Sequence, residues 1–227
     1  MTVEHNVVTR AMSLAAHELR TPVTVVAGYL RMLLREQAGP LTEKQKKLLE
    51  EADRSCGRLG ALVAEMSEFS RLEGGEVSLA RQDFDLAGLA AELAGGVPDG
   101  DDRGVRIEVR ASTPVVVNGD RARIAAALKV LMRSALRERV DPGVLTVGVS
   151  AGRGDPEWAV VAIGDEATLP ALESRAVGKL SDFDEWRGGL GLALPVARRV
   201  IEAHGGALWS SDSPGSRGGS AFRLPLK

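Results

Sequence analysis

Apolar residues recur at steps of three and four along the N-terminal part of the chain. One stripe consists of Met12, Ala16, Leu19, Val23, Val26, Leu30 and Leu33, and a second consists of Leu48, Ala52, Ser55, Leu59, Leu62, Met66 and Phe69. This heptad spacing is typical of amphipathic helices that pack together. Between the stripes, Gly39-Pro40 is a helix-stop signal and Thr42 is a candidate N-cap. The pattern predicts an antiparallel helical hairpin, roughly 5–37 and 43–72.

The hairpin by itself leaves half of each apolar stripe in contact with water. Two hairpins that pair into a four-helix bundle bury those halves, so we predict a homodimer. The alternative is a hairpin that packs against the remainder of its own chain.

After Gly74-Gly75 the pattern of apolar positions changes. Short alternating or continuous apolar runs predict strands over 105–109, 114–117, 145–149, 158–163 and 220–226, and helical runs lie at about 85–94, 120–139 and 190–204. Strands mixed with helices on one face of a sheet form an α+β sandwich. We therefore predict an α+β protein, with a helical hairpin domain over 1–76 and a sandwich domain over 77–227.

Composition and charge exclude some partners and sites. The 227 residues are 44% hydrophobic and carry a formal net charge of −2, which gives no sign of a nucleic-acid or membrane-surface partner. The single cysteine, Cys56, cannot form an internal disulfide, and the histidines lie too far apart in sequence to favour a zinc site. No membrane-length apolar run and no export leader are found. We expect a soluble, cytoplasmic chain, either whole or a fragment of a longer membrane protein.

The stretch AAHELRTPVT concentrates candidate chemistry inside the first predicted helix. His17 directly follows a stripe position, so it flanks the packed seam, and Thr21 lies one turn further on the same face. Glu18 is adjacent to the imidazole, and Pro22 introduces a helix defect that costs about 3 kcal/mol and that packing does not explain. Imidazole is nucleophilic near neutral pH, and a neighbouring carboxylate orients it and raises its basicity. The pattern favours a functional histidine over a merely solvated one.

The run His17-Glu18-Leu19-Arg20-Thr21-Pro22 resembles the H-box of bacterial two-component histidine kinases. The rest of the predicted hairpin is similar to that family's dimerisation and phosphotransfer domain. The resemblance implies that His17 accepts a phosphoryl group and that Glu18 hydrogen-bonds the imidazole. It also implies that Thr21 helps to position water when a partner's aspartyl phosphate is hydrolysed, and that response-regulator receiver domains are the partners.

The remainder of the chain resembles the ATP-binding catalytic domain of the same kinases, the Bergerat fold. The stretch GGLGL, then IEAHGG and the loop that follows it, is similar to the family's second and third glycine boxes. Glycines let the backbone approach phosphates, and a helix that begins near Leu190 points its amide groups at them. The resemblance implies that Gly189, Gly191 and Gly218 line a nucleotide site, whereas we expect His204 to be structural.

The metal-binding motif of that family is altered. The family carries two asparagines four residues apart, and the second holds Mg²⁺ against the phosphates. Here Val130 and Ser134 stand at these positions, while Arg137 keeps the place of a basic residue that contacts phosphate. Valine has no ligand atom, and the serine hydroxyl is shorter than an amide. We therefore predict that no metal is held.

The adenine motif of the family, Asp-x-Gly-x-Gly, is also altered. Asp165 keeps the place of the residue that bonds the adenine amine, but Ala167 and Leu169 are expected to crowd a loop that needs bare backbone. The lid, roughly 168–187, lacks the expected phenylalanine motif, and the three acidic residues of its SDFDEW stretch are expected to oppose phosphates. Asp165, Ser134, Arg137 and the three glycines would thus form a degenerate nucleotide site, with no cofactor predicted.

Three functional hypotheses follow from this contrast. The leading one is a phosphotransfer protein in which His17 receives a phosphoryl group from a partner histidine kinase or a receiver domain, and passes it to, or removes it from, a response regulator. The second is an active, ATP-dependent sensor histidine kinase that uses ATP and Mg²⁺ with altered contacts. The third is a non-catalytic dimeric scaffold that docks signalling partners.

Overall fold

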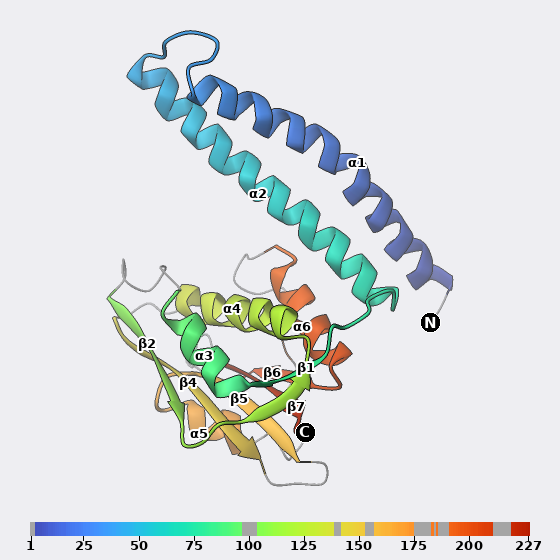
Figure 1. The fold of residues 1–227 in the computed structure, drawn as a ribbon, viewed down its shortest axis with the longest axis vertical. Coiled ribbons are helices and arrows are strands. Elements are labelled where there is room, and N and C mark those ends of the chain that lie inside the picture. The colour runs from blue at the N-terminus through green and yellow to red at the C-terminus, as the bar shows by residue number, and fades with distance from the viewer. Residues whose placement is uncertain are drawn as a thin grey trace. The chain divides into compact units, whose positions relative to one another are not determined.

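The computed structural model describes residues 3–96, 104–138, 142–152, 157–174, 183, 185, 191–210 and 219–227. The chain divides into two compact units, Met1–Val77 and Ser78–Lys227. The first unit is a helical hairpin and the second is a mixed α/β sheet domain (Figure 1). The predicted α+β class is confirmed.

Two long helices, α1 (Val3–Leu34) and α2 (Glu43–Glu73), form the hairpin. Helix α1 ends earlier than predicted because Glu36 and Gly39 take positive φ values of 56° and 115° in the turn. Thr42 is the N-cap of α2, and its hydroxyl and the Gln45 side chain each bond the other residue's backbone N–H, which is a capping box. None of the described helices is long and apolar enough to cross a membrane.

The seam of the hairpin is narrow. Ala16, Cys56, Val63 and Ser70 are buried, and the Ser70 hydroxyl donates a hydrogen bond of 2.7 Å to the Thr9 carbonyl across the seam. Much of both predicted stripes is exposed, namely Leu19, Val26, Leu48, Leu59 and Leu62. The two helices therefore bury only part of their apolar surface against each other.

The second unit is built on a five-stranded sheet with the order β2-β4-β5-β7-β6. Strands β2 and β4 are parallel, and the other neighbours are antiparallel. The strands are β2 (Val105–Ala111), β4 (Gly143–Gly152), β5 (Trp158–Gly164), β7 (Ser220–Pro225) and β6 (Ala207–Ser210). A separate two-stranded sheet pairs β1 (Gln82–Asp85) with β3 (Val116–Gly119). The prediction missed β1 and β6, which have four residues each, and placed β3 two residues too early.

Helices cover both faces of the five-stranded sheet, unequally. On one face lie α3 (Leu86–Ala94), α4 (Arg121–Glu138) and α6 (Ala193–Ala203), close to their predicted bounds (Figure 1). The short helix α5 (Leu169–Ser174), which the prediction assigned to the lid, lies on the other face. Its residues Leu169 and Leu172 pack in a hydrophobic cluster with Val160, Ala162, Trp209 and Ala221.

His204 joins α6 to the start of α4. It is only 3% exposed, its Nε2 accepts a 2.9 Å hydrogen bond from the Asp120 N–H, and its Nδ1 lies 2.7 Å from the Val200 carbonyl oxygen. The following Gly205 has a φ of +79°, and a Cβ at Gly206 would collide with the Arg223 carbonyl oxygen. The His-Gly-Gly run is thus held by packing and backbone geometry, and His204 has the structural position that we expected.

Candidate functional site

The candidate phosphoacceptor lies on the surface of α1. His17 is exposed and directly follows Ala16, which is fully buried in the hairpin seam. Glu18 and Thr21 are also exposed, and Thr21 is one helical turn from His17. The helix continues without interruption through Pro22. Seam packing therefore fixes the backbone beneath His17 while its imidazole stays accessible to a second reactant.

The face next to His17 is tied to the opposite helix. Arg20 donates a hydrogen bond of 2.7 Å from its guanidinium to the Ser67 hydroxyl on α2. One turn on, the Thr24 hydroxyl donates to the Arg20 carbonyl at 2.8 Å. These contacts hold the helix around Pro22, where one backbone N–H is missing. The imidazole and the Glu18 carboxylate need no part in that support.

A second group of predicted residues meets at one end of the five-stranded sheet. Thr146, near the start of β4, pairs with Gly164, so Asp165 follows β5 at the end of the sheet where β4 begins. Helix α4 ends at Glu138, shortly before β4 begins at Gly143. The sheet register therefore brings the C-terminal end of α4 and Asp165 to the same end of the domain, although they are far apart in sequence.

The same end contains a serine that the sequence did not single out. Ser220, the first residue of β7, pairs with Ile163 of β5. Because its neighbour Ala221 packs with α5, Ser220 points to the opposite face, which α3, α4 and α6 cover. It is fully buried, and its Oγ has no hydrogen-bond partner within the described part of the chain. A hydroxyl in an otherwise apolar strand was the available signal.

Helix α6 begins at this end as well. Ser210, the last residue of β6, pairs with Ser220, so the chain enters β6 at the far end and α6 starts near Ser220. The N-cap residue Leu192 makes no side-chain capping bond, and Gly191 before it has a φ of 64°. Uncapped amide groups at a helix N-terminus favour anions. Gly189 and Gly218 lie outside the described residues.

Asp165 is partly occupied by a local contact. Its Oδ1 accepts a hydrogen bond of 2.9 Å from the Thr168 N–H, at the start of α5. The expectation that Leu169 crowds the loop is wrong, because Leu169 packs with α5 on the opposite face of the sheet, 7% exposed. Ala167 is exposed to solvent. Neither residue has a positive φ, so the missing glycines cause no backbone strain here.

The position of the expected metal ligand differs from the prediction. Ser134 is fully buried in α4, and its hydroxyl donates to Glu138 Oε1 at 3.1 Å. It is therefore not available to solvent as a ligand. Arg137, by contrast, is exposed in the last turn of the helix. The structure brings Ser134, Arg137 and Asp165 to one end of the domain but leaves no amide at the metal position.

The acidic stretch of the predicted lid is partly neutralised. Glu185 lies 3.4 Å from the Arg198 guanidinium of α6, so this carboxylate is ion-paired with the protein. Asp182 and Asp184 lie outside the described residues. Phe183, from the same stretch, is buried. The expected repulsion of phosphates does not apply to Glu185.

The residues at this sheet end fit a nucleotide in part. Asp165 and the unpartnered Ser220 hydroxyl offer polar groups on the covered side of the sheet, where an adenine amine and ring nitrogens need partners. The uncapped start of α6 and Arg137 suit phosphates. The donor set at Ser134 does not fit Mg²⁺ by itself.

Comparison with known proteins identifies the family. Residues 8–75 match the His Kinase A (phospho-acceptor) domain. The chain is 28% identical over 221 residues to the sensor histidine kinase TrcS of Mycobacterium tuberculosis and 30% identical over 219 residues to the probable sensor histidine kinase TcrY of the same organism, each match covering 93% of this chain. The chain belongs to the histidine kinase family.

The fold of this histidine kinase family member matches solved structures as well. The full-length ShkA in complex with AMPPNP superposes with a TM-score of 0.76 at 23% identity, over 96% of this chain and 46% of that one. The chain spans 42% of TrcS and 44% of TcrY, less than half of each relative. The likeness to ShkA therefore concerns the fold, and the activity of the whole relatives is not carried over directly.

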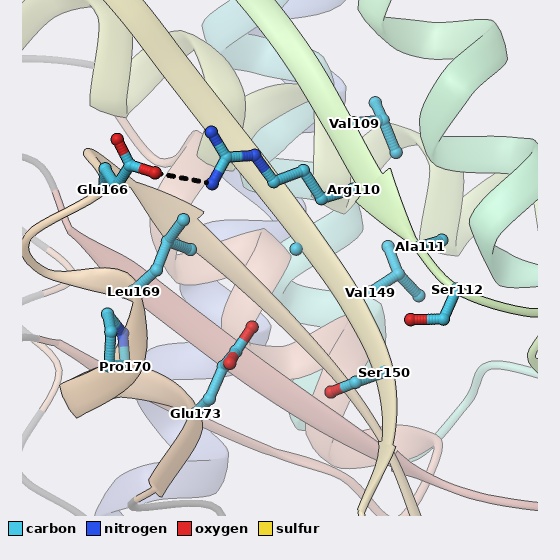
Figure 2. A pocket seen from close by; sticks show the side chains of 11 residues that line it. Val109, Arg110, Ala111, Ser112, Val149, Ser150, Glu166, Leu169, Pro170 and Glu173 are labelled. Atoms are coloured by element: carbon cyan, nitrogen blue, oxygen red, sulfur yellow. Dashed lines mark hydrogen bonds and ion pairs between the residues drawn. The ribbon is translucent and has the colours of Figure 1, made fainter.

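This family member has a further cavity, on the α5 face of the sheet. It encloses about 690 Å³ between β2, β4 and α5, and Figure 2 shows the Arg110 guanidinium paired with Glu166 at 3.1 Å. Glu173 leans over Gly148, where a Cβ would lie 2.7 Å from its carboxylate. The cavity is lined by none of the predicted site residues. The nucleotide-like residues and this cavity are on different faces.

Proposed function

We propose that the chain is the catalytic portion of an ATP-dependent histidine kinase of two-component signalling, with His17 as the phosphorylated residue. The relatives are sensor histidine kinases, which favours this alternative over the relay hypothesis. The observation that carries the proposal is the convergence of Asp165, the buried Ser220 hydroxyl and the uncapped start of α6 at one end of the sheet. These groups suit a nucleotide, and the missing glycines do not obstruct them.

The reaction uses few protein groups. A nitrogen of the His17 imidazole attacks the γ-phosphorus of ATP, so that a P–N bond forms while the bond to the ADP oxygen breaks and ADP leaves. The Glu18 carboxylate accepts a hydrogen bond from the other ring nitrogen and stabilises the positive charge that develops there. Transfer to a receiver aspartate then breaks the labile P–N bond. Thr21 is placed one turn away for the reverse task, positioning water for hydrolysis of a receiver phosphate.

An autophosphorylation assay tests the proposal. The full chain, incubated with γ-labelled ATP and Mg²⁺, should gain label that acid removes and alkali does not. The H17Q variant should gain none, and E18Q should label at least about tenfold more slowly, as expected for loss of a general base. The T21A variant should label normally and lose receiver dephosphorylation. Absence of label on the unmodified chain while AMPPNP still binds would contradict ATP-dependent phosphorylation.

The relay hypothesis keeps one specific observation in its favour. Val130 and Ser134 supply no amide ligand for Mg²⁺, and Ser134 is fully buried. If this loss is decisive, a receiver domain loaded with phosphate should label His17 although ATP does not. If neither donor labels His17 and receiver phosphate is not hydrolysed, the scaffold hypothesis is the remaining one.

Partners follow from the same proposal. The exposed apolar residues of the hairpin support a homodimer, and phosphotransfer requires response-regulator receiver domains; a partner histidine kinase is needed only by the relay. A cytoplasmic location stays a prediction. The assembly state is tested by a variant described in the Discussion.

A further inference from the structure

We infer that Glu138 supplies the metal ligand that Ser134 lacks, and that Ser134 positions its carboxylate. The inference rests on the proposed ATP-binding function, because the metal is one that bridges nucleotide phosphates. Mg²⁺ in such sites is bound by one or two carboxylates together with phosphates. A carboxylate one helical turn from the altered position is therefore a chemically sufficient replacement.

Distances within α4 support this role. Residues four apart lie on the same helix face, so Glu138 follows Ser134 on the side that the family uses for its second asparagine. The Ser134 hydroxyl donates to Glu138 Oε1 at 3.1 Å, which brings a carboxylate oxygen back along the helix. An asparagine amide oxygen at 134 would lie one bond beyond the serine oxygen. The glutamate oxygen thus lies close to the place of the missing ligand.

Burial separates the roles of the two residues. Ser134 is fully buried, whereas Glu138 is half-buried at the last turn of α4. The serine can therefore orient the carboxylate without meeting a hydrated ion, and only Glu138 is open to one. Ser134 is accordingly a positioning residue.

Electrostatics also calls for a cation here. The C-terminal end of a helix carries partial negative charge, so a carboxylate in the last turn is unfavourable unless a positive group compensates it. The sheet register places this end of α4 beside Asp165, Ser220 and the start of α6. A phosphate group at the start of α6 would be repelled by Glu138 unless a divalent cation lay between them. Nucleotide binding should therefore depend strongly on metal.

The test compares AMPPNP affinity with Mg²⁺ and with EDTA, by calorimetry on the full chain. The unmodified chain should bind at least about tenfold more tightly with Mg²⁺. In E138Q the affinity with Mg²⁺ should fall about tenfold or more, while the affinity in EDTA should rise, because the repulsion is removed. S134A should lose part of the metal effect, and S134N/E138Q should regain it. The matched control E173Q, on the other face of the sheet, should behave like the unmodified chain.

A second readout follows the metal directly. Mn²⁺ electron paramagnetic resonance, recorded with AMPPNP, should show less bound Mn²⁺ in E138Q than in the unmodified chain, and thermal unfolding should show that E138Q remains folded. An unchanged ratio of Mg²⁺ to EDTA affinity in E138Q would overturn the inference. Equal AMPPNP binding with and without metal by the unmodified chain would overturn it while leaving nucleotide binding intact. Failure to bind AMPPNP in either condition would overturn the proposed function too.

Discussion

At the scale of single residues, His204 shows how a motif shared with the family serves packing. Both ring nitrogens bond backbone groups, Nε2 accepting from Asp120 N–H and Nδ1 facing the Val200 carbonyl, so the neutral ring with hydrogen on Nδ1 satisfies both. A protonated ring would turn a second N–H toward the Asp120 N–H. Burial lowers the pKa of His204 below its usual range, and the nearby Arg81 and Arg123 add to this while Asp120 opposes it.

This pKa shift predicts an acid-sensitive contribution to stability. Above about pH 6.5 the ring is neutral in the folded and the unfolded chain, and it contributes no pH dependence. Below that pH the unfolded chain binds a proton that the folded chain resists, so the free energy of unfolding falls, by at most about 1.4 kcal/mol per pH unit. Urea unfolding from pH 7.5 to 5.5 should show a steeper loss for the unmodified chain than for H204Q. Equal slopes would contradict this account.

At the scale of elements, α5 decides how the family's adenine motif is accommodated. Leu169 and Leu172 anchor this short helix on the sheet, and the Trp209 indole N–H donates to the Leu172 carbonyl at 3.0 Å. Asp165 forms the turn that begins α5. The leucine at the position of a family glycine is therefore part of a core on the face opposite Ser220. Its replacement of glycine adds packing rather than removing space from the site.

The L169G variant, which places the family's glycine there, distinguishes these roles. It should lower the free energy of unfolding by about 3 kcal/mol or more, because a buried leucine side chain is removed from a packed cluster. AMPPNP affinity should not improve in the fraction that stays folded. The control A167G changes an exposed turn residue and should cost less than about 1 kcal/mol. Tighter AMPPNP binding by L169G would show that the leucine does crowd the site.

Elements with a clear period were predictable, whereas contacts between distant segments were not. The heptad steps and Thr42 located both hairpin helices, because these signals are local. The burial of Leu169 on the α5 face depends on which side of the sheet α5 covers, and spacing does not encode that. Likewise, Ser220 joins Asp165 only through the pairing of β5 with β7. The role of Glu138 needed the side-chain contact with Ser134.

At the scale of the whole molecule, the two units carry complementary parts of one reaction. The hairpin unit presents His17 on its surface, and the sheet unit gathers the nucleotide-like residues. Described large apolar side chains that are exposed lie, with the exception of Val116, in the hairpin. Such a concentration in one unit is what a self-associating bundle requires. The sheet unit, with its buried core, has no comparable surface among its described residues.

Leu59, 54% exposed on α2, tests whether that surface is an interface between copies. L59E should shift the chain from dimer to monomer in analytical ultracentrifugation, because a buried carboxylate without a partner disfavours the four-helix bundle. Its helical circular dichroism should persist only in part if the hairpin needs its partner, so oligomeric state is the deciding readout. The neighbouring control R58E reverses a charge at an exposed position and should leave the dimer intact. A monomeric unmodified chain at tens of micromolar would instead support the hairpin covering its apolar face without a second copy.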